Sequence, residues 1–455
     1  MQDLDSTIVA VATPAGRGGV GCVRVSGPSA EEIGRRLFRP AAAGRPRVGG
    51  RPRFGSFLAR DGSPLDHGYL VLFPPGASFT GEPVAELWAH GSPAVLAELV
   101  EAAVAEGARP AGPGEFTYRA LRHGRLDLAR AEAVRDLVAA RTLYQARVAL
   151  AQAEGALSRR LAPLRESLEE WIARGEAAVE FVEESETHLA PGQLGRGIAA
   201  LLAACDELLR GFEAGRLVRD GAALVVAGLP NAGKSSLFNA LLSRDRAIVA
   251  EAAGTTRDTL EEQLDLGGVP VRLIDTAGLR EASDRVESEG VRRAELARRE
   301  ADLILMVLDA SRPLDPLEVA ALGRAGDEPE RERTVWVLNK CDLRAVARVP
   351  AEAGALRVSA LTGAGLDGLR AELRDRLLGR GPLEPPVLTD TRHALALRQA
   401  RAALERGAEA ASGAFSEELL LEDLREAMRH LGEITGEFGT EQLYDRIFST
   451  FCIGK

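Results

Sequence analysis

The spacing of hydrophobic residues changes twice along the first half of the chain, and each change predicts a different kind of structure. Residues 1–120 hold short apolar runs separated by glycine and proline, a pattern typical of a small α/β domain. The clearest strand-like runs are Thr7–Ala12, Cys22–Val25, Tyr69–Phe73 and Val84–Trp88. From Leu121 to Leu217 apolar residues recur every three or four positions with few breakers, which predicts two or three long amphipathic helices.

A third pattern begins at Gly221 with the letters ALVVAGLPNAGKSSLFNALL, which read as a buried strand, a glycine-rich turn and a helix. Strands and helices then alternate to Leu378, the letters GPLEPP read as a linker, and the remaining tail returns to helix before FCIGK. We therefore expect a multidomain chain that combines α/β and all-α parts. Its expected divisions are an α/β domain (1–120), a helical part (121–217), an inserted α/β domain (218–380) and a second helical part (381–455).

Composition and charge restrict the classes of function. The chain has 455 residues, 45% hydrophobic and 27% charged, as in folded globular proteins. Its net charge of -10 argues against a protein that binds nucleic acid by itself through phosphate neutralisation. No apolar run approaches a membrane span, the first residues lack a basic leader, and four scattered cysteines suggest no disulfide framework. We expect a cytoplasmic protein without a membrane partner.

Lysine is rare in this chain, and its positions are informative. Only three of the 57 basic residues are lysines, namely Lys234, Lys340 and Lys455. Where arginine has replaced lysine almost everywhere, a remaining lysine marks a place where a compact ammonium is needed. Two of the three lie in the nucleotide motifs described next.

The segment from Gly228 to Ser235, GLPNAGKS, matches the phosphate-loop pattern, with a strand before it and a helix after it. Glycines allow backbone N–H groups to turn toward phosphate oxygens, and the helix N-terminus adds a favourable field. We expect Lys234 to reach the outer phosphates and Ser235 to ligate Mg²⁺. The residues expected at the phosphates are Asn231, Ala232, Gly233, Lys234, Ser235 and Ser236.

Three further motifs follow in the order that a GTPase requires. The DTAG segment (Asp275, Thr276, Ala277, Gly278) follows an apolar strand and is expected at Mg²⁺ and the γ-phosphate. In the NKCD segment (Asn339, Lys340, Asp342), the Asp342 carboxylate would accept hydrogen bonds from guanine that adenine cannot offer. The segment Ser359, Ala360, Leu361 would close over the base. Together the four motifs predict a GTP/GDP site in a Ras-like P-loop G domain with a mixed, mostly parallel sheet.

The switch segments leave the origin of catalysis open. Thr256, in the segment GTTRD, is the natural second Mg²⁺ ligand. Leu279 follows Gly278 where Ras-like GTPases keep a glutamine that orients water, and a leucine cannot do so. Catalysis must therefore come from another group, or the chain is a slow switch that relies on a separate activating protein.

Several segments together closely resemble the MnmE/TrmE family of tRNA-modification GTPases, from residue 7 to the end. They are ATPAGRGGVG, FTGE, GEFTYRA, LDLARAEAV, GLPNAGKSSLFNAL, GTTRD, DTAGLRE and the terminal FCIGK. The resemblance implies that potassium-stimulated hydrolysis is coupled to dimerisation of two G domains and that K⁺ takes the place of an arginine finger. Its implied ligands are Asn231, Ala250, Ala252 and Thr255, in a switch loop formed by Ala250, Glu251, Ala252, Ala253, Gly254 and Thr255. It also implies that Glu287 positions the attacking water, although a glutamate there is more commonly a solvated surface charge.

The resemblance further implies an N-terminal domain that forms a homodimer and binds a tetrahydrofolate derivative, formyl or methylene. The matching residues are Arg24, Glu82 and Arg125, together with Lys455 of the same chain or of the partner. Position 125 holds arginine where the family commonly has lysine. Family members also carry Cys452 and its nucleophilic role stays open, because a small packed thiol is the more common case. The string GRGGVG (16–21) matches the dinucleotide fingerprint, but a strand-like run follows it, so we expect no dinucleotide there.

The nucleotide motifs predict a GTP hydrolase. The resemblance implies that it drives 5-aminomethyl or 5-carboxymethylaminomethyl modification of the wobble uridine of tRNA. By resemblance it works with the flavoprotein MnmG, which holds FAD, in a heterotetramer-type complex, and tRNA binds through that complex. One alternative is an Era-like regulatory GTPase in ribosome assembly, although no basic RNA-binding module follows Leu378. Another is a helical scaffold with a vestigial G domain, which the intact nucleotide motifs make difficult to sustain.

Overall fold

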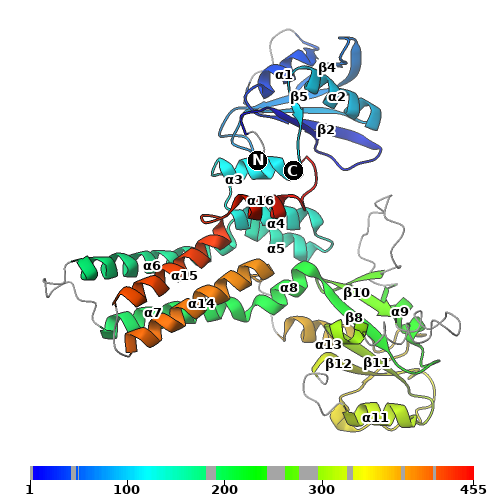
Figure 1. Cartoon of the computed structure of the whole chain (residues 1–455). Helices are drawn as coiled ribbons and strands as arrows, with labels where there is room; N and C mark the ends of the chain where they lie inside the picture. Colours follow the sequence, from blue (N-terminus) through cyan, green and yellow to red (C-terminus); the bar gives the residue numbers. More distant parts are fainter. Residues whose placement is uncertain are drawn as a thin grey trace, which may run out of the picture. The chain divides into compact units, whose positions relative to one another are not determined.

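The computed structural model describes residues 4–42, 48–49, 51–180, 191–242, 262–275, 296–324, 332–380, 385–412 and 417–454. The chain forms two compact units, coloured by residue number in Figure 1. The first comprises residues 1–135, 153–158 and 429–455, and the second comprises 136–152 and 159–428. The four-part division expected from the sequence is finer than this and stays a prediction.

The first unit contains a seven-stranded sheet with the order β3-β4-β5-β6-β2-β1-β7. Neighbouring strands are antiparallel except for the short parallel pair of β1 and β7. The strands are β1 (Ile8–Val11), β2 (Gly18–Ser26), β3 (Phe38–Pro40), β4 (Arg53–Leu58), β5 (Pro64–Phe73), β6 (Val84–Gly91) and β7 (Arg109–Pro110). Three of the four strand-like runs identified in the sequence are confirmed as parts of β2, β5 and β6, and the fourth, Thr7–Ala12, contains β1.

Two helices, α1 (Ala30–Arg36) and α2 (Pro93–Ala105), cover one face of this sheet. Alternate strand residues such as Val23, Val25 and Leu87 pack beneath them in one apolar core. Part of the other face carries α3 (Glu115–Arg122), whose Phe116 packs on β1. The GRGGVG string leads into β2 and no helix follows it directly, so the βαβ context of a dinucleotide site is absent there, as expected.

The C-terminal segment belongs to the same unit as the N-terminal sheet. Helix α16 (Glu441–Phe448) packs with α3 and with α4 (Leu128–Ala139) through a cluster of aromatic and aliphatic residues that includes Phe448 and Phe451. Gly454 has φ +96°, and a Cβ there would lie 2.2 Å from the carbonyl oxygen of Val11. The penultimate residue therefore has to be glycine for the tail to lie this close to β1.

The second unit contains a six-stranded sheet with the order β13-β12-β11-β8-β10-β9, parallel except for β9 at the edge. The strands are β8 (Ala222–Ala227), β9 (Glu262–Leu266), β10 (Val269–Asp275), β11 (Leu303–Asp309), β12 (Thr334–Asn339) and β13 (Leu356–Arg357). Helices α9 (Lys234–Leu242), α11 (Pro316–Arg324) and α13 (Leu366–Leu378) belong to this α/β part of the second unit, with a 3₁₀ turn at Ala351–Ala353.

Both faces of this sheet are covered, which explains its continuous apolar strands. Residues such as Leu224, Val226 and Val307 pack beneath α9 and α13, and their neighbours Val225 and Met306 face the other side. The mostly parallel, three-layered arrangement confirms the P-loop G-domain fold expected from the sequence.

The remaining helices are α5 (Leu143–Ala153), α6 (Ala156–Glu180), α7 (Pro191–Arg210), α8 (Phe212–Asp220), α14 (Thr391–Ser412) and α15 (Glu417–Thr435). The sequence predicted two or three helices between Leu121 and Leu217, whereas five helices, α4 to α8, begin within the described part of this segment. One boundary that the sequence analysis missed is the start of α5, which is marked by a capping box. Thr142 Oγ1 accepts from the Gln145 N–H at 3.1 Å, and Gln145 Oε1 accepts from the Thr142 N–H at 3.2 Å. Among the described residues, no helix is both long enough and apolar enough to cross a membrane.

Candidate functional site

The candidate nucleotide site lies at the carboxyl edge of the six-stranded sheet. Strand β8 ends at Ala227 and runs into the phosphate loop, while β10, β11 and β12 end at Asp275, Asp309 and Asn339. Asp275 pairs in register with Val226, and Asp309 pairs with Asn339. The carboxyl ends of these strands therefore meet at one edge, where α/β proteins bind their ligands.

The phosphate loop is shaped by three residues with positive φ. These are Gly228 at 144°, Asn231 at 62° and Gly233 at 89°. A Cβ on Gly228 would lie 2.3 Å from the Val307 carbonyl oxygen, so only glycine fits there. The loop leads directly into α9, whose first N–H groups have no partner within the helix. This cradle fits a bound phosphate group.

Lys234 lies inside the loop rather than in solvent. Its side chain is largely buried, and its Nζ donates to the carbonyl oxygen of Leu229 at 2.9 Å. The ammonium thus lies within the phosphate loop. Its expected role at the outer phosphates stays a prediction. Ser235 and Ser236 are exposed at the start of α9, so the Ser235 hydroxyl is accessible to a cation beside the loop.

Asn339 is buried, and its side chain connects several loops of the site by hydrogen bonds. Its side chain is 1% exposed, and its Nδ2 donates to the Ala232 carbonyl oxygen at 3.0 Å. Its Oδ1 accepts from the Ala360 N–H at 3.0 Å. A single amide therefore joins the end of β12, the phosphate loop and the loop after β13, because it can donate and accept at the same time.

The candidate base-recognition residues Asp342 and Ser359 are joined by a hydrogen bond. Ser359 is fully buried, and its Oγ donates to Asp342 Oδ1 at 2.5 Å. The other carboxylate oxygen, Asp342 Oδ2, is not the acceptor of this hydrogen bond. It would accept from a guanine edge. Leu361 is 85% exposed, and its expected closure over a bound base stays a prediction.

Sequence reasoning missed Asp309, at the end of β11. Its Oδ2 lies 2.6 Å from Lys340 Nζ, and the Lys340 ammonium also donates to the Asn231 carbonyl oxygen at 2.8 Å. Burial raises the pKa of the Asp309 carboxyl, but hydrogen bonds from Lys340 and Ser311 outweigh it and hold the pKa below its usual value. The sequence did contain a signal for Asp309: it is an aspartate at the end of an apolar strand that precedes the strand of the NKxD motif.

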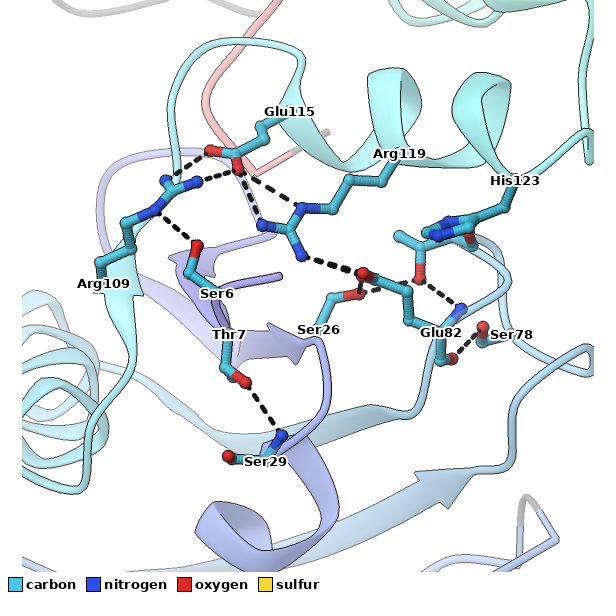
Figure 2. Close-up of polar contacts among 11 residues, drawn as sticks. Ser6, Thr7, Ser26, Ser29, Ser78, Glu82, Arg109, Glu115, Arg119 and His123 are labelled. Carbon is cyan, nitrogen blue, oxygen red and sulfur yellow. Dashed lines mark hydrogen bonds and ion pairs between the residues drawn. The ribbon is translucent and has the colours of Figure 1, made fainter. Parts of the chain in front are cut away.

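The candidate folate residue Glu82 is part of a buried network in the first unit (Figure 2). Its carboxylate accepts from Arg119 at 3.0 and 3.1 Å and from Ser26 Oγ at 2.8 Å. Arg119 is fully buried and also donates to Glu115, which in turn binds Arg109. Charges therefore alternate along the network, and the Glu82 carboxylate has a fixed orientation. Neither Arg119 nor Glu115 was singled out from the sequence.

Two other candidate folate residues, Arg24 and Arg125, are also described in the first unit. Arg24, on β2, forms an ion pair with Glu86 on β6 at 2.9 Å and donates to the Gly454 carbonyl oxygen at 3.4 Å. Arg125 packs beside Gly81, which precedes Glu82: a Cβ on Gly81 would lie 3.4 Å from Arg125 Cγ. The structure thus brings Arg24 to the C-terminal tail and Arg125 to the loop that carries Glu82.

Several candidates lie outside the described residues, so their predicted roles stay predictions. They are Ala250, Glu251, Ala252, Ala253, Gly254, Thr255, Thr256, Thr276, Ala277, Gly278, Glu287 and Lys455. Cys452 is described and exposed, and its carbonyl oxygen accepts from the Gly114 N–H at 3.4 Å. All four cysteines are free thiols.

Two family models match the chain. The model described as "MnmE helical domain" matches residues 128–452, and "GTP-binding protein TrmE N-terminus" matches residues 7–125. The chain is similar to a tRNA modification GTPase MnmE of Xanthomonas campestris, 46% identical over the full length of both proteins. It is also similar to that of Aquifex aeolicus, 42% identical over 98% of this chain and 99% of the relative. A relative from Pseudomonas aeruginosa is 44% identical over the full length of both.

Proposed function

Because this chain belongs to the MnmE family of tRNA modification GTPases, we propose that it binds and hydrolyses GTP to drive modification of the tRNA wobble uridine. The observation that carries this proposal is the meeting of the phosphate loop and the NKxD motif at one edge of the sheet, joined by Asn339. The product would be a 5-aminomethyl or 5-carboxymethylaminomethyl uridine. Full-length relatives named for tRNA modification favour this reaction over a role in ribosome assembly.

In this proposal the chain's own residues bind and orient the nucleotide. Lys234 and the first N–H groups of α9 hold the phosphates, and Asp342 accepts from the guanine edge. The Ser235 hydroxyl, together with Thr256, would hold Mg²⁺, which neutralises phosphate charge when bound. Asp275 ends β10 at the same edge, next to β8, a placement consistent with an indirect contact to that metal.

We propose that hydrolysis is stimulated by K⁺ rather than by an arginine finger. Asn231 would hold the ion with Ala250, Ala252 and Thr255, and Glu287 would orient the attacking water. The described part of this set supports the assignment, because Asn231 is exposed at the tip of the phosphate loop in the left-handed conformation. A cation at this point would offset the charge that develops on the phosphates.

The test compares GTP hydrolysis by the full chain in KCl and in NaCl at equal ionic strength. We expect a potassium-specific acceleration that is lost in both Asn231→Ala and Asn231→Gly, since both remove the amide and glycine also tolerates the positive φ. Asn239→Ala is the matched control, because Asn239 is exposed on the adjoining helix α9. Equal slow rates in both salts would exclude the potassium mechanism.

We propose that a tetrahydrofolate derivative binds in the first unit at Arg24, Glu82, Arg125 and Lys455. The support is the oriented carboxylate of Glu82, suited to the amine groups of a pterin, with Arg125 on the adjacent loop. The C-terminal tail contacts Arg24 through the Gly454 carbonyl oxygen, which supports a contribution from Lys455, of the same chain or of the partner. Equilibrium dialysis with 5-formyltetrahydrofolate tests this proposal: Glu82→Gln should weaken binding, and Glu98→Gln, which alters an exposed ion pair on α2, should not.

We also propose that the first unit forms a homodimer through the open face of its sheet. Phe54 and Tyr69 are each 50% exposed on β4 and β5, and Trp88 on β6 is 37% exposed. They line a hollow of about 700 Å³, and exposed apolar patches of this kind mark interaction sites. Light scattering should show a dimer that Tyr69→Asp dissociates. Leu317→Asp, at an exposed leucine of the G domain, is the control and should leave the dimer intact.

The remaining parts of the proposal concern partners. The chain would work in the cytoplasm with the flavoprotein MnmG, which supplies FAD, and tRNA would bind through that complex. The decisive assay is mass spectrometry of tRNA nucleosides from cells that carry this chain as their only MnmE. Modified wobble uridine should appear with the wild type and be lost with Asp342→Asn; unmodified tRNA with both would refute the proposed function.

A further inference from the structure

Two strained residues of the nucleotide site contact each other. Among the described residues, only two residues other than glycine have a positive φ: Asn231 at 62° and Lys340 at 63°. Most residues other than glycine adopt this left-handed conformation at a cost, and asparagine at a smaller one, so surrounding contacts help to hold it in place. The Lys340 ammonium provides such a contact, because it donates to the Asn231 carbonyl oxygen at 2.8 Å.

Asp309 determines where that ammonium lies. Lys340 has a long, flexible side chain that is 31% exposed, and its Nζ is 2.6 Å from Asp309 Oδ2. The other carboxylate oxygen of Asp309 accepts from the backbone N–H of Ser311 at 2.9 Å and from its hydroxyl at 2.6 Å. Since both oxygens are engaged and the residue is only 6% exposed, the carboxylate has one orientation and fixes the lysine in turn.

We propose that Asp309 is a positioning residue for potassium-stimulated hydrolysis. By fixing Lys340, it holds the Asn231 backbone in the left-handed conformation and so directs the Asn231 side chain toward the cation. The inference rests on the proposed function, which assigns that side chain to K⁺. Asp309 acts only through Lys340 and Asn231 and makes no contact with the reacting atoms.

This role predicts an effect on the potassium requirement rather than on the maximal rate. Without the carboxylate, Lys340 is no longer fixed and Asn231 is correctly oriented for only part of the time, so that more K⁺ is needed for the same occupancy. At saturating K⁺ the bound state restores the orientation, and the maximal rate recovers. A role in general folding stability would not produce this separation.

The experiment measures GTP hydrolysis against KCl concentration at constant ionic strength for Asp309→Asn. Asp302→Asn is the matched control, because Asp302 precedes the same strand at its opposite end and holds Arg216 at 2.9 Å and the Ala223 N–H at 2.8 Å. Ser311→Ala is the milder second variant, which loosens Asp309 and leaves the charge in place. Melting temperature and affinity for a fluorescent GDP are recorded for every variant.

We expect Asp309→Asn to raise the half-saturating K⁺ concentration about tenfold or more, the value of one charged hydrogen bond, with the maximal rate nearly retained. Ser311→Ala should shift the half-saturating K⁺ concentration in the same direction. This variant tests the proposal if Asp309→Asn does not fold. Asp302→Asn should leave that concentration unchanged. If the wild type needs K⁺ and both Asp309→Asn and Ser311→Ala behave like Asp302→Asn, only this inference is overturned. If the wild type shows no preference for K⁺, the proposed potassium mechanism fails together with it.

Discussion

The buried network around Arg119 permits a quantitative prediction for the first unit. Arg119 is fully buried between the carboxylates of Glu82 and Glu115. In Arg119→Met, Glu115 keeps its ion pair with Arg109 at 2.6 Å, whereas Glu82 keeps only the hydrogen bond from Ser26. One buried carboxylate thus loses its cation. Breaking a buried pair from one side costs about 3–5 kcal/mol, so the free energy of unfolding of this unit should fall by about that amount.

The assay is urea unfolding followed by the fluorescence of Trp88, which lies on β6 of the same unit. Trp171 and Trp336 belong to the second unit and are replaced by phenylalanine in the reference protein, so that the signal reports one unit. The double variant Arg119→Met with Glu82→Gln removes both charges. It should recover about 0.5–3 kcal/mol relative to Arg119→Met, as coupled residues do.

Two results would contradict this reasoning. Arg119→Met could cost less than about 1 kcal/mol, the level of an exposed ion pair, which would mean that the network contributes little net stability. Alternatively, the double variant could be less stable than Arg119→Met alone. The stabilising element would then be the packing of the arginine stem and not the pairing of charge.

Three further predictions follow from the described residues. Asp342→Asn should weaken GTP binding at least about tenfold in a titration with fluorescent GTP, because the amide cannot accept both guanine donors. Burial raises the pKa of Glu115, but hydrogen bonds from Arg109 and from a backbone N–H outweigh it and hold the pKa below its usual value. The stability that Glu115 contributes should therefore be complete above pH of about 4.3 and be lost as the pH falls further, as measured by urea unfolding at several pH values. In thiol labelling of the native protein, exposed Cys452 should react first, whereas burial raises the pKa of Cys22 and Cys205 to about 12 and should protect them.

Sequence alone predicted the G-domain fold and the order of its nucleotide motifs. The reason is local: the phosphate loop needs glycine where φ is positive, and the strands before it and before NKCD must be apolar because both faces of the sheet are covered. The strand-like runs of the N-terminal sheet were predicted for a similar reason, since strands between turn residues have a short-range signature. The helix boundary at Thr142 was also encoded locally, as a capping box, and was overlooked.

Other features depend on residues that are far apart in the chain. Arg24 meets Gly454 across 430 positions, Lys340 meets Asp309 across 31, and Arg119 meets Glu82 across 37. No periodicity marks such pairs, because a buried charge finds its partner only after strands and helices have packed. The sequence by itself therefore determined which residue types could bind a nucleotide. The tertiary structure decided which carboxylate orients each cation, since low-dielectric burial makes a charge acceptable only where folding has placed its counterion.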